Sequence, residues 1–336
     1  MDALTQTLDA SWYVDPAIHT AEQRAIFASS WQLVGHAAEH PPGSATEVDL
    51  GAASLVLARD PDGVLRGFHN VCRHRAAPLL SAGEHRRCRV LRCPYHGFQY
   101  DLHGRLTKTP GFGAVLDPAS HALHPVEVGT WRGFVFVHLG ADPAPLEAFV
   151  APLEQATAGI DLASLSPTSH AVHPIACNWK TYVDNYLEGY HVPYLHPTLS
   201  RQVDVAAYEV VVSGRTIEHR SPTKSPSSQV AGLWLFLWPN VALNVYARGM
   251  SLERIVPTGP QTMEIRYTYL FHDGVTPEER AREQALSAEI TAEDLAMVEA
   301  VQRNLARGVY TKGWLSPVHE NGLAAFQGWV REALEG

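Results

Sequence analysis

Residues 70–100, NVCRHRAAPLLSAGEHRRCRVLRCPYHGFQY, place two cysteines and two histidines in a pattern that predicts a metal centre and the domain around it. Cys72 and His74 form a C-x-H pair, Cys93 and His96 form a C-x-x-H pair, and eighteen residues separate the pairs. Each pair can lie on its own loop, so two facing loops would present two thiolates and two imidazoles. In a Rieske [2Fe–2S] centre, cysteines hold one iron and histidines hold the other. Mixed pairs suit that cluster because each loop then gives one ligand to each iron.

A structural zinc ion is the alternative for these four residues, since two cysteines and two histidines can also bind zinc. Zinc fingers more often pair like with like, as C-x-x-C followed by H-x-x-x-H. Pro94 and Gly97, beside the second pair, fit a tight loop. The other two cysteines, Cys88 and Cys177, fall outside the pattern and are predicted to be buried small hydrophobic residues rather than ligands.

The sequence on both sides of the motif has the residue pattern of strands and turns. Residues 46–50, 54–60 and 64–71 alternate apolar and polar side chains, which indicates strands. The same pattern continues to about residue 139. It predicts a small all-β domain at residues 31–139.

A second stretch, residues 178–197, NWKTYVDNYLEGYHVPYLHP, predicts another metal site. His191 and His196 are five residues apart, and Glu188 lies three residues before His191, one helical turn away on the same face. Pro193 would interrupt a regular helix after the first histidine, so the second can return to the same side. Two imidazoles with a distant carboxylate would form the facial triad of a non-heme iron(II) oxygenase, with positions open for O2 and substrate. A buried helix end with two satisfied histidines is the alternative.

Together the two motifs resemble those of the Rieske non-heme iron oxygenases, the α subunits of ring-hydroxylating and related oxygenases. The resemblance covers most of the chain, and the eighteen-residue gap is at or slightly above the usual length. It implies an α+β fold, in which the all-β Rieske domain is joined to a catalytic domain, residues 1–30 and 140–336. That domain would hold a curved antiparallel sheet wrapped around a long helix. The implied cofactors are a Rieske [2Fe–2S] cluster and a mononuclear iron(II).

The resemblance also implies a third iron ligand, an aspartate on a late helix. Residues 277–308 carry apolar residues at helical spacing and predict that helix. Within it, EDLAMVEAVQRNL looks like the family's carboxylate helix, which puts the ligand at Asp294. Glu293 is the competitor for this role, and a solvated acidic helix face is the alternative for either residue.

The catalytic domain is expected to supply a substrate pocket. Strands are predicted at residues 207–219, 231–238, 241–247, 250–256 and 262–272. In the second of these, aromatic and aliphatic residues alternate, so one face is wholly aromatic. With Tyr246, the aromatic residues of that face could cage a trimethylammonium group by cation–π attraction; they are Trp234, Phe236 and Trp238. The alternative is a sheet that turns this face to the core.

The resemblance assigns further roles near the iron. In the family, a carboxylate three residues before the first histidine ligand bridges to a Rieske histidine of the neighbouring subunit, and Glu188 occupies that position. Glu188 is therefore expected to relay electrons and to orient His191, with Asp184 as the fallback. Because this path crosses a subunit boundary, a homotrimer or larger ring-shaped homo-oligomer is expected. Asn178 is a further candidate for the lining of the iron site.

The expected activity is that of an oxygenase. Electrons from NAD(P)H would arrive through a separate reductase or ferredoxin, because the chain shows no nucleotide fingerprint such as G-x-G-x-x-G. The stretch LEGYHVPYLHP and the C-terminal residues look closest to the branch that acts on choline, betaine and carnitine-like quaternary amines, by hydroxylation, N-demethylation or C–N cleavage. An aromatic acid or polycyclic compound, hydroxylated by one or two oxygen atoms, is the alternative substrate. A redox or metal-binding protein that uses only the Rieske site is the alternative of another class.

Composition argues against several other classes. The 336 residues carry a formal net charge of −9 with no run of Lys and Arg, so nucleic acid is not an expected partner. The start, MDALTQTLDASWY, lacks a basic segment followed by an apolar one. No apolar run reaches the roughly 18 residues of a membrane span, so no membrane partner is expected. The placement of the cysteines suggests ligands in a reducing compartment, and a cytoplasmic protein is expected.

Overall fold

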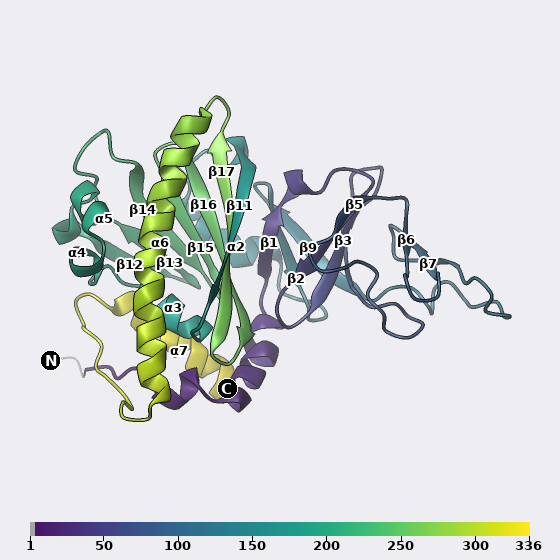
Figure 1. The fold of residues 1–336 in the computed structure, drawn as a ribbon, viewed down its shortest axis with the longest axis horizontal. Coiled ribbons are helices and arrows are strands. Elements are labelled where there is room, and N and C mark those ends of the chain that lie inside the picture. The colour runs from purple at the N-terminus through teal and green to yellow at the C-terminus, as the bar shows by residue number, and fades with distance from the viewer. Residues whose placement is uncertain (1–3) are drawn as a thin grey trace. The chain divides into compact units, whose positions relative to one another are not determined.

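The computed structural model describes residues 4–336, and these form two compact units (Figure 1). The first, Phe27–Ala148, is called the β unit below. The second, called the α+β unit, combines the described residues up to Ile26 with Phe149–Gly336. The domain predicted at residues 31–139 lies inside the range of the β unit.

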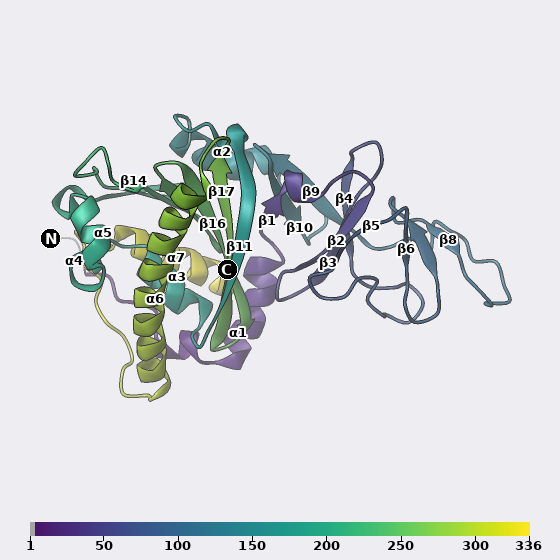
Figure 2. The same cartoon turned by 45° about the horizontal axis from the view of Figure 1, so that its top comes forward.

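The β unit is built from two antiparallel sheets (Figure 2). The larger has seven strands in the order β1 (Gln32–His36), β10 (Phe134–His138), β9 (Pro125–Trp131), β4 (Leu65–His69), β3 (Ser54–Arg59), β2 (Ser44–Asp49) and β5 (His85–Arg87). The smaller has three strands, β6 (Val90–Arg92), β7 (Gln99–Asp101) and β8 (Leu106–Lys108). The expected all-β fold of this domain is confirmed.

The large sheet of the β unit buries apolar side chains on both faces. In β3, Val56 packs into one cluster of buried side chains and its neighbour Leu55 packs into another. Successive residues of a strand point to opposite faces, so a strand covered on both sides reads as a continuous apolar run. The cluster around Val56 also contains Cys72 and Cys93. The two loops that carry these cysteines are therefore anchored in the hydrophobic core.

The α+β unit contains one seven-stranded antiparallel sheet. In spatial order its strands are β11 (Leu165–Ile175), β17 (Thr262–His272), β16 (Gly249–Gly259), β15 (Val241–Tyr246), β14 (Val230–Leu237), β13 (Thr216–Arg220) and β12 (Glu209–Ser213). The sheet curves around the long helix α6 (Pro277–Ala306), which crosses it in both views (Figures 1 and 2). The expected α+β architecture, a curved sheet around a long helix, is confirmed.

Helix α6 begins at a defined cap and is bonded to the sheet. The Thr276 side chain accepts a hydrogen bond from the N–H of Glu279, and the Glu279 side chain accepts one from the N–H of Thr276. Four turns later, the Tyr267 hydroxyl of β17 lies 2.8 Å from Oγ1 of Thr291 on the helix. The cap sets where the helix starts, and the bond to β17 sets how it lies over the sheet.

Two strands of this sheet differ from the prediction. Residues 207–219, predicted as one strand, form β12 and β13, which turn at Gly214 with a φ of +54°. The Ser213-Gly214 pair is a turn signal of the kind that marks such a hairpin. Strand β11 is absent from the predicted strands because it contains Pro167 and Pro174 and has few apolar residues. It lies at the sheet edge, where proline is tolerated because one side of the strand makes no ladder hydrogen bonds.

The remaining helices are shorter than α6. They are η1 (Ala10–Tyr13), α1 (Pro16–Glu22), η2 (Gln23–Phe27), η3 (Ala37–Glu39), α2 (Leu146–Ala156), η4 (Leu162–Ser164), α3 (Trp179–Tyr186), α4 (Val192–Leu195), α5 (Pro197–Gln202), η5 (Val205–Ala207) and α7 (Asn321–Glu335). Phe326 of α7 packs edge-on against Trp179 of α3 and against Phe236 of β14. Within residues 4–336, no helix has the length and apolar character needed to cross a membrane.

A fully buried ion pair joins α1 to α3. Glu22 and Lys180 each have 0% of their surface exposed, and the Lys180 ammonium group donates to the Glu22 carboxylate. Nε1 of Trp179 donates to the other carboxylate oxygen at 2.8 Å. The ammonium group also lies 5.3 Å from the centre of the Tyr13 ring. Each buried charge is thus compensated, which is the condition under which a protein interior tolerates it.

Replacing Lys180 by Met should lower the free energy of unfolding by about 3–5 kcal/mol, because Glu22 would remain buried without its countercharge. Combining Lys180→Met with Glu22→Gln should cost less than the single change, since no unpaired charge is left. The control is Arg303→Met, which breaks a largely exposed pair with Glu299 and should cost less than ~1 kcal/mol. Urea unfolding compares the variants. A double variant as unstable as Lys180→Met would show that the unpaired charge is not the cause.

Candidate active site

Two loops of the β unit carry the cysteine and histidine pairs. Cys72 and His74 follow β4, and Cys93 and His96 lie between β6 and β7. The N–H of Gly97 donates to the Cys93 carbonyl at 3.1 Å and closes the second loop. Gly97 has a φ of +75°, a conformation that favours glycine and explains why glycine follows the second histidine.

Among the four side chains of these loops, the two thiols are buried and the two imidazoles lie next to each other. Both thiols are buried, with 2% of Cys72 and 2% of Cys93 exposed, and both belong to the same core cluster of the β unit. The imidazoles are only partly buried, and Nδ1 of His74 is 3.2 Å from Nδ1 of His96. Burial raises the pKa of the Cys72 thiol, a cost that a metal ion offsets by binding the thiolate.

The spacing of the donor atoms distinguishes a two-iron cluster from a single zinc ion. A tetrahedral zinc ion binds its ligands at about 2.0–2.3 Å, so all four donor atoms would lie within about 4 Å of one another. Among residues 4–336, only His191, His196 and Asp294 bring three such donor atoms within 4.8 Å of one another. The thiol pair and the imidazole pair therefore do not converge on one point, and they fit a cluster with one iron for each pair. Cys88 and Cys177 take no part in either pair, and burial raises the pKa of Cys177 to about 12.

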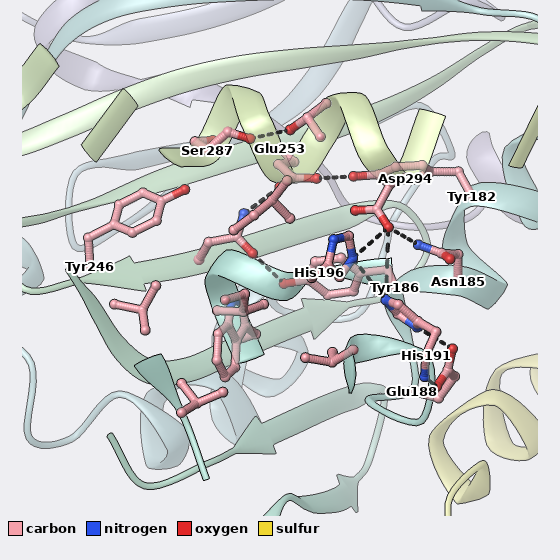
Figure 3. Close-up of a pocket in the computed structure, with 18 of the residues that line it drawn as sticks. Tyr182, Asn185, Tyr186, Glu188, His191, His196, Tyr246, Glu253, Ser287 and Asp294 are labelled. Atoms are coloured by element: carbon pink, nitrogen blue, oxygen red, sulfur yellow. Dashed lines mark hydrogen bonds and ion pairs between the residues drawn. The ribbon is translucent and has the colours of Figure 1, made fainter. Parts of the chain in front are cut away.

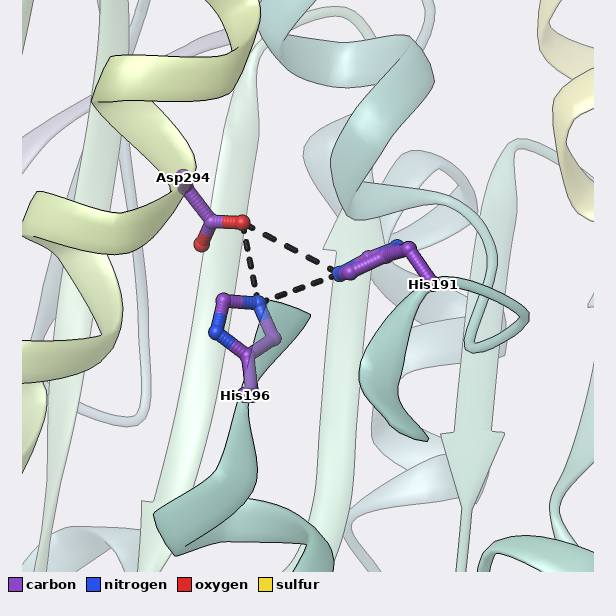
Figure 4. A group of neighbouring side chains, drawn as sticks. All are labelled: His191, His196 and Asp294. Carbon is purple, nitrogen blue, oxygen red and sulfur yellow. Dashed lines mark hydrogen bonds and ion pairs between the residues drawn. The ribbon is translucent and has the colours of Figure 1, made fainter. Parts of the chain in front are cut away.

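Three side chains of the α+β unit converge on one point (Figure 4). His191 precedes α4, His196 lies between α4 and α5, and Asp294 lies in the middle of α6. Nε2 of His191 is 3.1 Å from Nε2 of His196. Oδ1 of Asp294 is 3.0 Å from Nε2 of His196 and 3.9 Å from Nε2 of His191. The backbone leaves the helical conformation at His196 (φ −116°, ψ 75°), which turns its imidazole back toward the first one.

These distances fit a metal ion with two nitrogen ligands and one oxygen ligand. Adjacent ligands of an octahedral ion, each about 2.1 Å from the metal, lie about 3 Å apart. Two of the three separations, 3.1 Å and 3.0 Å, match that value, and the third is longer at 3.9 Å. Three such ligands would occupy one face of an octahedral ion, and its other positions would be open to O2 and substrate. This is the donor set of the facial triad in non-heme iron(II) oxygenases.

The other ring nitrogens of the two histidines are held by carboxylates. Nδ1 of His191 contacts the Glu188 carboxylate, and Nδ1 of His196 lies 2.7 Å from Oε2 of Glu293. Glu293, the competitor for the third ligand position, thus lies on the far side of His196, whereas Asp294 faces both Nε2 atoms. Burial would lower the pKa of His196, but Asp294 and Glu293 outweigh burial and raise it. Such partners fix the tautomer and the orientation of a ligating imidazole.

Two residues predicted near the iron lie elsewhere. Oδ2 of Asp184 accepts hydrogen bonds from the Tyr13 hydroxyl at 2.6 Å and from Gln327 at 3.1 Å, and burial raises the pKa of Asp184 to about 7. Its carboxylate therefore faces η1 and α7 rather than the histidines. The prediction that Asn178 lines the iron site is wrong, because its side chain caps α3 by accepting a hydrogen bond from the Lys180 N–H.

A cavity of about 80 Å³ opens beside the three converging side chains (Figure 3). Aromatic rings form much of its wall; they belong to Tyr182, Tyr186, Tyr208, Trp234, Tyr246 and Tyr267. The rings of Tyr208 and Trp234 stack with their centres 6.1 Å apart. Trp234 and Tyr246, predicted as pocket residues, are both in this wall.

The predicted pocket wall fails for Phe236 and Trp238. They share a strand face with Trp234, but they pack against α7 instead of lining the cavity. The ring of Phe236 lies 5.8 Å from that of Phe326, and the ring of Trp238 lies 5.9 Å from that of Trp329. Alternation predicts which side chains share a face, but it does not predict which element covers each end of that face.

Three residues around the cavity were outside the predicted site. Nδ2 of Asn185 donates to Oδ1 of Asp294 at 2.8 Å. Glu253 is 3% exposed and Asn244 is 6% exposed, and both line the cavity. Asn244 is the one polar residue of β15, and Glu253 is a charged residue in the buried part of β16; such residues are rarely buried without a partner or a function. That signal could have identified the last two from the sequence.

Comparison with protein families matches both parts of the chain. A family model described as ring hydroxylating alpha subunit (catalytic domain) matches residues 162–336. A second model, described as Rieske [2Fe-2S] domain, matches residues 30–123. The two domains imply a Rieske cluster and a mononuclear iron, as expected from the motifs. A redox protein that uses only the Rieske site has no support, because the catalytic domain is also present.

Curated relatives align along nearly the whole chain. Choline monooxygenase of Atriplex hortensis, a chloroplastic protein, is 30% identical over 352 residues, which cover 99% of this chain and 79% of that protein. The carnitine monooxygenase oxygenase subunit of Escherichia coli (strain K12) is 30% identical over 360 residues, covering 98% and 94%. Proteins of this family are oxygenase components that take electrons from a separate partner.

Solved structures agree with these matches. The quaternary ammonium Rieske monooxygenase CntA in complex with L-carnitine has a TM-score of 0.86 at 27% identity, covering 98% of this chain and 96% of that one. Naphthalene 1,2-dioxygenase from Rhodococcus sp. has a TM-score of 0.83 at 19% identity, covers 98% and 94%, and shows the fold alone. With a Rieske domain and a ring-hydroxylating α-subunit catalytic domain in one chain, this protein belongs to the Rieske non-heme iron oxygenases.

Proposed function

We propose that this protein is a Rieske monooxygenase that oxidises a quaternary ammonium compound with O2, by hydroxylation, N-demethylation or C–N cleavage. In the insertion step, a substrate C–H bond and O2 are converted to C–OH and water, which consumes two electrons and two protons. NAD(P)H supplies the electrons through a separate reductase or ferredoxin. The observation that carries the proposal is the aromatic cavity beside His191, His196 and Asp294.

The cavity suits a cation with alkyl groups. Aromatic faces attract cations, and cages of tyrosine and tryptophan rings recognise quaternary ammonium groups. The relatives named choline monooxygenase and carnitine monooxygenase support the same substrate class. An aromatic substrate has less support, because the similarity to naphthalene 1,2-dioxygenase, at 19% identity, concerns the fold. Aromatic ring hydroxylation, by one or two oxygen atoms, is therefore not proposed.

His191, His196 and Asp294 would hold the mononuclear iron, and Cys72, His74, Cys93 and His96 would hold the Rieske cluster, on the donor geometry described above. When bound, the cluster supplies electrons and the mononuclear iron supplies O2 activation.

The side chains around the iron ligands orient them. Glu188 can accept the Nδ1 proton of His191, and Glu293 can accept that of His196, so both Nε2 atoms carry a free lone pair toward the iron. Asn185 donates to Asp294 and holds its carboxylate in position. The aromatic walls then exclude water and hold the substrate cation beside the iron.

We assign electron relay to Glu188, and Asp184 is not needed as a fallback because it faces Tyr13 and Gln327. A relay through Glu188 to the Rieske histidine of another copy requires a homo-oligomer, and we propose a ring-shaped one, of which a homotrimer is the simplest. The solved structure of a quaternary ammonium Rieske monooxygenase, 27% identical to this chain, is described as giving insights into inter-subunit electron transfer, which supports this arrangement. A cytoplasmic location stays part of the proposal.

Replacing Asp294 by Ala should remove the mononuclear iron and leave the Rieske cluster. Iron analysis should fall from about three irons per chain to about two, because a facial triad that lacks its carboxylate binds iron weakly. The visible spectrum of the cluster should persist, while substrate-dependent O2 uptake should be lost. Glu293→Ala is the matched control one residue away and should keep most of the iron. If Glu293→Ala loses the iron and Asp294→Ala retains it, Glu293 rather than Asp294 is the third iron ligand.

Replacing Glu188 by Gln should slow electron transfer without removing iron. The amide oxygen can still accept the His191 proton, so ligand orientation is kept, but the negative charge of the relay is gone. In single-turnover experiments, oxidation of the reduced cluster by O2 and substrate should slow at least tenfold. Glu289→Gln, an acid on α6 that contacts Thr198, serves as the control and should keep the normal rate. A normal rate in Glu188→Gln would exclude the relay role.

Quaternary amines should stimulate O2 uptake by the reconstituted enzyme, and aromatic acids should not. Trp234→Ala should weaken binding of a trimethylammonium compound by about 2- to 30-fold, since one cation–π contact contributes about 0.5–2 kcal/mol. Trp234→Phe keeps a ring and should lose less. O2 uptake driven by benzoate or phthalate, with no response to choline or L-carnitine, would overturn the proposed substrate class.

A further inference from the structure

The cavity beside the iron ligands holds a carboxylate that the mechanism above does not use. Glu253 lies on β16, is 3% exposed, and lines the cavity together with Asp294 and Glu188. Unlike those two, it contacts neither histidine. In Figure 3 it lies on the wall of the cavity next to Tyr182.

The groups bound to Glu253 are neutral. Its Oε2 accepts a hydrogen bond from the Tyr182 hydroxyl at 2.8 Å, and its Oε1 accepts one from the Asn244 amide. These donors satisfy the oxygen atoms but do not cancel a negative charge. Burial raises the pKa of Glu253 to about 7. A buried carboxylate in this position is stabilised when a cation enters the cavity.

The chain itself provides no such cation. No lysine or arginine is among the residues that line the cavity in the described chain. The two histidines of the lining, His191 and His196, face the metal position. No lysine or arginine among the described residues of the cavity wall supplies a countercharge to Glu253, and a cationic ligand would supply one.

The side chains that line the cavity also disfavour a negative charge on the ligand. A substrate carboxylate would enter a buried space that offers it no lysine or arginine and that already contains Glu253, and an unpaired buried charge is costly. Recognition of a carboxylate in a protein normally uses arginine or lysine.

We infer that Glu253 is the specificity-determining residue for the substrate cation, and that the substrate is a small quaternary or tertiary ammonium compound without a carboxylate. This inference rests on the proposed function and narrows it. Zwitterions, in which an ammonium group and a carboxylate are joined by a short chain, are poor substrates.

Binding to the reduced, anaerobic holoenzyme tests this with three probes of similar shape. Choline carries the cation and an alcohol, glycine betaine carries the same cation and a carboxylate, and 3,3-dimethylbutan-1-ol is the neutral analogue of choline. By calorimetry, wild-type enzyme should bind choline at least tenfold more tightly than glycine betaine. Glu253→Gln should weaken the binding of choline at least tenfold and change the affinity for the neutral alcohol by less than twofold.

A matched control is Glu283→Gln on α6. Glu283 is also buried, with 4% exposed, and burial raises its pKa to about 7, but it does not line this cavity. Glu283→Gln should leave all three affinities unchanged. Equal affinity of wild-type enzyme for choline and glycine betaine would overturn the inference, and this comparison needs no variant to fold. If Glu253→Gln weakens the binding of choline and of the neutral alcohol equally, the residue has a structural role and the inference is overturned.

The outcome for the proposed function is separate. If quaternary amines bind and stimulate O2 uptake but the zwitterion is preferred, only the role of Glu253 fails. If none of the quaternary amines binds wild-type enzyme and an aromatic acid does, both the proposed substrate class and this inference fail.

Discussion

The iron-binding geometry of this protein depends on the hydrogen bonds that hold helix α6 in place on either side of Asp294. Upstream of Asp294, Thr291 is bonded to Tyr267 of the sheet at 2.8 Å. Downstream, Oε1 of Gln302 accepts a hydrogen bond from the Thr181 hydroxyl on α3 at 2.9 Å. The helix is thus held on both sides of its ligand, to the sheet and to the helix that leads into the histidines. A shift of one residue along α6 would rotate the carboxylate by about 100° and remove it from the site.

Buried charge is handled in two ways in the same unit. Glu22 and Lys180 neutralise each other away from the cavity, so their charges serve the packing of α1 against α3. Glu253 is bonded only to neutral donors, and it lies where a ligand can reach it. The Glu22–Lys180 ion pair leaves no buried charge without a countercharge. The Glu253 carboxylate has no such countercharge, which costs stability but leaves the group available to bind a ligand.

The two metal sites are assembled over very different distances along the chain. The cysteine and histidine pairs lie on two loops that are eighteen residues apart, and each loop contributes one cysteine and one histidine. The facial triad needs α6, about a hundred residues beyond the histidines, to pass over the sheet. The first site is assembled from two loops near each other in sequence, whereas the second exists only once the whole α+β unit is folded.

The sequence by itself determined what depends on near neighbours: the mixed Cys72/His74 and Cys93/His96 pairs, the alternating strands and the long helix. Tertiary structure decided what depends on distant elements. It places Glu293 behind His196 rather than at the point where the Nε2 atoms meet, and it covers Phe236 and Trp238 with α7. It brings Glu253 to the cavity, and it uses a proline-containing stretch as the edge strand β11. The physical reason is that periodicity gives the face on which a side chain lies, while the element packed on that face comes from far along the chain.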